Sequence, residues 1–106
     1  MVKFSDKAWR SQDVKVAFEN EAERLFAPWT VGRQPGWTCD TRTKNLVVLG
    51  LWLREELTAM GLSEADRKAQ EWFFDRKARA EDDLFALAAL TLNNAHEGKI
   101  DTYAGR

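Results

Sequence analysis

The chain has 106 residues, of which 44% are hydrophobic and 31% are charged, and its formal net charge at pH 7 is −1. This balance excludes the low hydrophobicity and high net charge of disordered chains, and the length suits one compact domain covering residues 1–106. A nearly neutral chain also creates no long-range field for capturing a partner by its phosphates.

The first predicted helix covers about residues 12–27. Apolar residues recur there at steps of three and four, from Val14 to Phe26, as in an amphipathic helix. Pro28 should end this helix, because the residue before a proline resists the helical conformation and proline itself lacks an N–H donor.

Residues 28–44 break the helical pattern with two prolines and two glycines around two Trp-Thr pairs. Pro35 and Gly36 suit the two central positions of a type II turn. We therefore expect an irregular or hairpin-like insertion. A segment of this length without regular structure is uncommon in a compact domain unless it binds something.

The second predicted helix covers residues 45–60 and is apolar on all sides over its first two turns, which predicts burial all round. Gly61 is placed to end it in the left-handed conformation. Ser63 and Asp66 form a variant capping box that begins a third helical segment over residues 63–93. The charged residues 75–83 leave open whether this segment is one long helix or two shorter ones.

The predicted fold is therefore mostly α, a compact bundle of three to four helices with residues 95–106 as a frayed or partner-ordered tail. The apolar run between residues 84 and 90 would overshoot its neighbour if the third segment were straight. It must be covered by the first helix, by a bend, or by a second chain. The residues expected at this core or oligomer interface are Leu84, Phe85, Leu87 and Leu90.

Large aromatic residues are plentiful in this chain, whereas the side chains used in most catalysis are scarce. There are five Trp and six Phe but one His and one Cys, and nothing in the sequence places Cys39 beside His96. A structural zinc site and a di-iron site both lack their ligand patterns. We expect no enzyme, no catalytic residues, no metal and no cofactor.

The start of the chain lacks a secretory signal pattern, and the apolar stretches are about half the length of a membrane span. With a single cysteine, no intramolecular disulfide can form. These features favour a cytoplasmic protein with no membrane partner.

Trp and Arg are the residues most enriched at protein interaction hot spots, and the sequence contains two clusters that suit this role. The predicted partner-binding residues are Trp29, Arg33, Trp37, Arg42 and Lys44 in the insertion, and Arg76, Lys77 and Arg79 on the long helical segment. We expect a small interaction module that binds another protein or protein complex. Examples are an adaptor, an assembly subunit, or a phage-encoded inhibitor of a host complex.

Two alternatives stay open. The same basic and aromatic residues could stack the bases of a nucleic acid, and a homo-oligomer such as a virion component could use the apolar run. The turn at residues 60–63 resembles that of a helix-turn-helix DNA reader, but Glu64 and Asp66 at the start of the following helix would repel phosphate.

Overall fold

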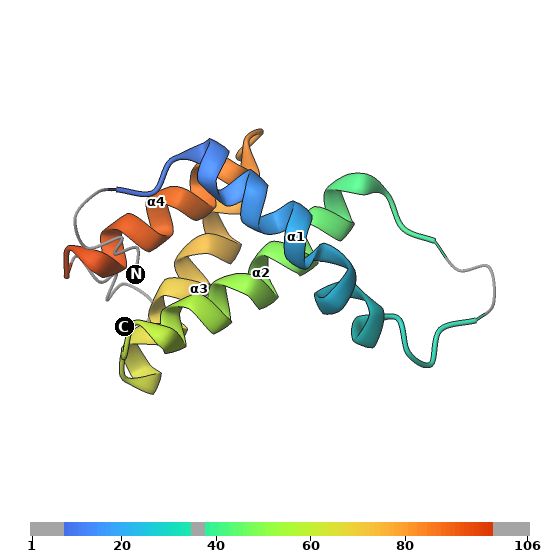
Figure 1. Ribbon diagram of the computed structural model, residues 1–106, viewed down its shortest axis with the longest axis horizontal. Coiled ribbons are helices and arrows are strands. Elements are labelled where there is room, and N and C mark those ends of the chain that lie inside the picture. Colours follow the sequence, from blue (N-terminus) through green and yellow to red (C-terminus); the bar gives the residue numbers. More distant parts are fainter. Residues whose placement is uncertain (1–7, 35–37, 99–106) are drawn as a thin grey trace.

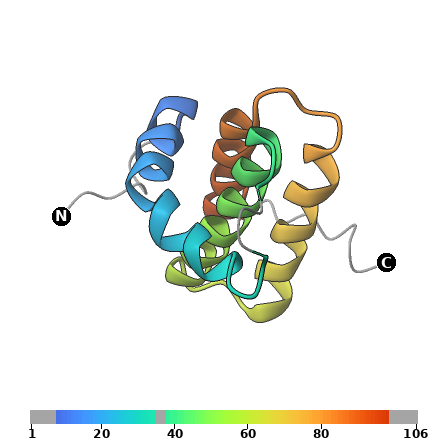
Figure 2. The same ribbon diagram turned by 90° about the vertical axis from the view of Figure 1, so that its right-hand side faces the viewer.

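The computed structural model describes residues 8–34 and 38–98, and these residues form four helices and no strand (Figure 1). The helices are α1 (Ser11–Trp29), α2 (Thr41–Ala59), α3 (Glu64–Ala78) and α4 (Leu84–His96). Helices α2 and α4 pack together in the middle, with α1 and α3 on opposite sides of them (Figure 2). The predicted mostly α bundle is confirmed, with four helices.

The core lies around the central pair of helices. Phe74 of α3 and Trp52 of α2 are buried in it, and the Trp52 ring meets the ring of Trp9 edge to face at 5.4 Å between centroids. The fully buried side chains of α2 include Leu49, Leu53 and Leu57, which recur every four residues along one stripe of the helix, and Val48 beside them. Because α2 is enclosed by three other helices, its first half can be apolar on nearly every face.

Helix α1 continues two residues past the predicted end at residue 27, so the expectation that Pro28 ends the helix is wrong. Pro28 lies in the last turn, where its missing N–H forfeits a single intrahelical hydrogen bond. The backbone N–H of Thr30 closes the turn by donating to the carbonyls of Phe26 at 3.3 Å and Ala27 at 3.1 Å.

Helix α2 begins four residues before the predicted start at residue 45. Asp40 is its N-cap, and the carboxylate accepts the backbone N–H of Thr43 at 2.9 Å. Hydrogen bonding from Thr43 lowers the pKa of Asp40. The insertion is therefore shorter than predicted. Its described residues, 30–34 and 38–40, are irregular, and the predicted type II turn falls on residues 35–37, outside the described part.

The segment predicted over residues 63–93 is two helices, which resolves the alternative that the sequence left open. Asp83 begins α4 by accepting the backbone N–H of Ala86 at 3.0 Å. Its carboxylate also suits the positive end of the helix dipole. The predicted left-handed conformation of Gly61 is confirmed by its φ of 88°. Ser63 is the N-cap of α3 and accepts the backbone N–H of Asp66 at 3.1 Å, which is one of the two hydrogen bonds of the predicted capping box.

The break between α3 and α4 returns the apolar run to the core, and α1 covers it. Leu84 and Leu87 are buried, and the ring of Phe85 meets that of Phe18 in α1 at 5.2 Å between centroids. Leu90 points outward and is 48% exposed. The apolar run is therefore covered within one chain by two of the three predicted means, the bend and the first helix.

Two polar contacts fix α1 on its neighbours. At the start of α1, Asn93 accepts the backbone N–H of Trp9 at 2.8 Å and donates to its carbonyl at 3.0 Å. Near the end, Arg24 donates to both carboxylate oxygens of Glu55 in α2, at 3.2 and 2.7 Å. This pair lowers the pKa of Glu55, whereas burial, followed by repulsion from Glu55, raises the pKa of Glu56.

Candidate functional site at one end of the bundle

The end of α1 and the start of α2 bring aromatic and basic side chains together. The guanidinium of Arg33 lies over the Trp29 ring, 4.3 Å from its centroid, and the ammonium of Lys44 lies 5.1 Å from the Phe26 ring centroid. The Phe26 and Trp29 rings are 5.5 Å apart. We call these four residues the aromatic–basic end. Each cation faces an aromatic ring, an arrangement that is attractive in itself.

A depression of about 420 Å³ opens at the aromatic–basic end. The residues that line it are Phe26, Thr30, Arg33, Gln34, Thr38, Cys39 and Lys44. Arg33 and Lys44 are its two charged residues, and both are cations. The depression therefore suits a ligand group that is anionic and offers a flat or apolar surface to the Phe26 ring.

The first turn of α2 carries Arg42 and Lys44 and no acidic residue, although the start of a helix is the positive end of its dipole. The N-cap carboxylate of Asp40 directly precedes these cations. Two cations at this position are locally unfavourable for the helix. Arg42 is compensated because its guanidinium donates to the carbonyl of Ala78 at the end of α3.

The structure brings together three of the five partner-binding residues predicted in the insertion. Trp29, Arg33 and Lys44 all belong to the aromatic–basic end. Arg42 points instead to the end of α3, where it ties two helices together. Trp37 lies outside the described residues.

The second predicted cluster lies at the end of α3. Arg76 stacks over the Trp72 ring at 4.8 Å, Lys77 lies 6.0 Å from the Phe73 ring, and Arg79 is the C-cap. The contact from Arg42 to Ala78 places this cluster beside the start of α2. The acidic residues 81–83 follow directly in the chain, so this region carries both signs of charge.

Sequence reasoning missed the aromatic partners of these cations. Trp72 precedes Arg76 by four residues and Phe73 precedes Lys77 by four, a spacing that places side chains on one helix face. Applied to aromatic and basic residues, this rule would have identified both pairs. The contact of Lys44 with Phe26 joins two helices, so local spacing cannot reveal it.

Cys39 and His96 are far apart. Cys39 follows the end of α1, whereas His96 ends α4 beside the start of α1. Nineteen helical residues, about 28 Å, separate the two ends of α1. Within residues 8–34 and 38–98, no group of three or more His, Cys, Asp or Glu side chains could hold a metal ion, and no helix is long and apolar enough to cross a membrane.

Comparison with protein families, with curated proteins and with solved structures finds no match to this chain. The geometry of the described side chains is therefore the basis for assigning a function.

Proposed function

We propose that this protein is a non-enzymatic interaction module that binds an acidic surface of another protein through its aromatic–basic end. The observation that carries the proposal is that Arg33 stacks on Trp29 and Lys44 on Phe26, with both cations and the Phe26 ring lining one depression. Trp and Arg, which pair here as Trp29 and Arg33, are among the residues most enriched at interaction hot spots. An adaptor, an inhibitor and an assembly subunit all act through such a surface.

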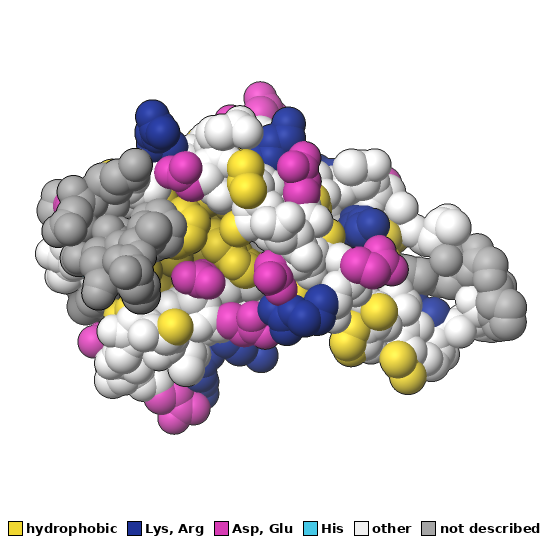
Figure 3. All heavy atoms as spheres, viewed as in Figure 1, with side chains coloured by type: hydrophobic (Ala, Val, Ile, Leu, Met, Phe, Trp, Pro, Cys, Tyr) yellow, Lys and Arg dark blue, Asp and Glu magenta, His cyan; other side chains and the backbone are white. Residues whose placement is uncertain are grey.

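The charge distribution supports a protein partner over a nucleic acid. The chain has a formal net charge of −1, and the face in Figure 3 carries basic and acidic side chains side by side. Nucleic acid binders usually present an extended basic stripe that neutralises many phosphates. Here the basic end of α3 is followed by Glu81, Asp82 and Asp83, which would repel a phosphate backbone.

The burial of the apolar run gives less support to a structural homo-oligomer. Leu84 and Leu87, two of the four residues expected at a subunit interface, are core residues. Phe85 packs on Phe18 of the same chain, which leaves Leu90 as the outward-facing member.

The separation of Cys39 from His96 supports the absence of a thiol-imidazole enzyme. Cysteine nucleophiles need a base within hydrogen-bond distance. Cys39 lies just before α2, near the end of α1, whereas His96 ends α4, near the start of α1.

Affinity capture from native host extract tests the proposal. Wild-type protein should retain a protein partner after nuclease treatment, and Arg33→Ala should lose it while keeping its circular dichroism spectrum and melting temperature. Lys15→Ala is the matched control, because Lys15 is an exposed cation on α1 away from this end. Capture that disappears with nuclease, or that both variants retain equally, would contradict the proposal.

A further inference from the structure

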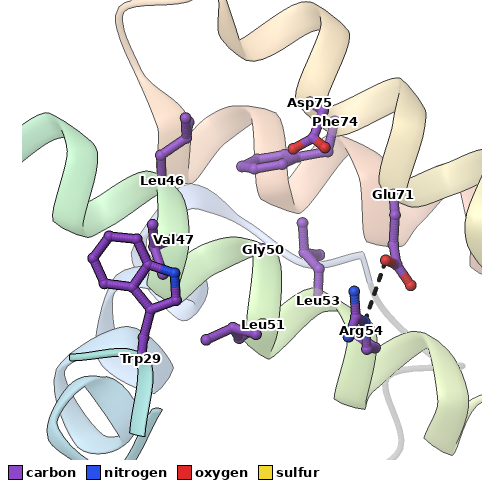
Figure 4. Close-up of a pocket in the computed structure, with 10 residues that line it drawn as sticks. All are labelled: Trp29, Leu46, Val47, Gly50, Leu51, Leu53, Arg54, Glu71, Phe74 and Asp75. Atoms are coloured by element: carbon purple, nitrogen blue, oxygen red, sulfur yellow. Dashed lines mark hydrogen bonds and ion pairs between the residues drawn. The ribbon is translucent and has the colours of Figure 1, made fainter. Parts of the chain in front are cut away.

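A second hollow, of about 260 Å³, lies between α2 and α3 (Figure 4). We call it the α2–α3 groove. Its apolar lining comes from Leu46, Val47, Leu51 and Leu53 of α2, Phe74 of α3 and the ring of Trp29. An apolar cavity of about 150 Å³ is enough to hold benzene, so this groove has room for one large side chain.

Gly50 keeps the groove open. It lies in the interior of α2, where glycine is less stable than alanine by about 0.5–1 kcal/mol. A Cβ atom at this position would meet nothing within 4 Å. The helix backbone is thus accessible from the groove, as at sites where another chain approaches closely.

The α3 side of the groove is acidic. Glu71 is paired with Arg54 across the groove at 3.3 Å (Figure 4) and with Arg67 one turn earlier. Asp75 lies beside Phe74, and no described residue forms a hydrogen bond or an ion pair with its carboxylate. Burial, followed by repulsion from Glu71, raises the pKa of Asp75, and the charge of Arg79 offsets this only in part. Asp75 is therefore a carboxylate that an incoming cation would stabilise.

We propose that the α2–α3 groove binds a polypeptide segment of the partner that inserts an apolar side chain above Gly50 and places a Lys or Arg beside Asp75. This inference rests on the proposed function, because it names a second contact for the same kind of partner. Trp29 connects the two surfaces, since its ring lines the groove and also stacks against the guanidinium of Arg33. An anionic lipid or a nucleic acid would be repelled by Asp75.

Two capped dipeptides of opposite charge test this chemistry. Acetyl-Phe-Arg-amide and acetyl-Phe-Glu-amide carry the same apolar side chain, and each is titrated into isotopically labelled full-length protein while backbone amide resonances are followed by NMR. The Phe-Arg probe should shift the resonances of Gly50, Leu51 and Asp75 and bind at least about threefold more tightly than Phe-Glu. Equal affinities, or shifts confined to other residues, would overturn the proposal.

Filling the groove provides the second test. Gly50→Leu should weaken Phe-Arg binding about tenfold or more, because burial of one apolar side chain is worth roughly that factor. Ala59→Leu is the matched control, since Ala59 is exposed at the far end of α2, and it should bind as wild type does. Unchanged binding by Gly50→Leu would overturn the proposal. Asp75→Asn, which leaves the groove open, should reduce the preference for Phe-Arg to less than about twofold.

The proposal for the groove and the proposal for the aromatic–basic end can be refuted separately. Lys44→Ala should leave dipeptide binding unchanged while it weakens capture of the partner, because Lys44 stacks on Phe26 and neither residue is among those that line the groove. If Lys44→Ala weakens the dipeptides as much as Gly50→Leu does, the groove assignment is wrong. If the dipeptides bind as expected but capture is insensitive to both Arg33→Ala and Lys44→Ala, only the role of the aromatic–basic end is wrong. If a single-stranded oligonucleotide shifts the same groove resonances, the proposal that the groove binds a polypeptide would also be overturned.

Discussion

Replacing Gln70 by methionine should stabilise this protein. Gln70 is 0% exposed on the core side of α3, and neither its Nε2 nor its Oε1 has a hydrogen-bond partner within the described part of the chain. A buried polar group without a partner costs about 1–3 kcal/mol. Methionine has a similar length and no polar group to desolvate, so Gln70→Met should raise the free energy of unfolding by about that amount.

Urea denaturation followed by circular dichroism measures this change directly. For a domain of this size, 1 kcal/mol corresponds to about 4–8 °C in melting temperature, so a thermal scan gives a second reading. Gln12→Met is the matched control, because Gln12 is exposed on α1 and the change there should stay within about 0.5 kcal/mol. If Gln70→Met lowers stability by more than about 1 kcal/mol while Gln12→Met has no effect, the Gln70 amide is hydrogen-bonded in solution and the reasoning is refuted.

Three further substitutions test other parts of the structure. Gly50→Ala should raise the free energy of unfolding by about 0.5–1 kcal/mol, because the glycine lies in a helix interior with open space around it; a loss of stability would show that the space is filled. Asn93→Ala should lower it by about 1–3 kcal/mol in the same assay, since two hydrogen bonds to Trp9 are lost, whereas Asn94→Ala should change it far less. Glu56→Gln should stabilise the protein near pH 7, and this benefit should shrink as the pH falls toward 4.5, the ordinary pKa of a glutamate, and be gone below about pH 4, because a raised pKa means that folding disfavours the ionised form; a benefit that persists unchanged at low pH would contradict this.

The helical content of the fold could be predicted because the apolar residues repeat at helical spacing. The stripe through Leu49, Leu53 and Leu57 is buried as expected, and the caps at Gly61 and Ser63 have the expected geometry. The two helix boundaries that were predicted wrongly, the end of α1 and the start of α2, depend on a few hydrogen bonds at the helix ends. Asp40 is a favourable N-cap residue, and recognising it would have placed the start of α2 correctly.

The division of the last helical segment could not be decided from periodicity alone. The stripe through Phe74, Ala78 and Phe85 is compatible with one helix or with two, and the choice depends on how Asp83 and Arg42 satisfy the backbone groups at the break. The contact from Arg42 to Ala78 joins residues 36 positions apart, which local sequence patterns cannot reveal.

The candidate site was partly predictable. Trp29, Arg33 and Lys44 were predicted as partner-binding residues from their aromatic and basic side chains, and the structure brings these three residues together. The α2–α3 groove was missed, because the all-round apolar pattern of α2 predicted complete burial, whereas Val47 and Leu51 are only partly buried. Gly50 was the available signal, since a glycine inside an otherwise apolar helix leaves a gap in the side-chain surface.

The contact between Trp9 and Asn93 indicates where the protein can be attached to a solid support. It brings residues from the two halves of the chain together at the start of α1, about 28 Å along that helix from Trp29. A linker to a bead or a sensor surface attached near either of these residues therefore leaves Arg33 and Lys44 facing solution.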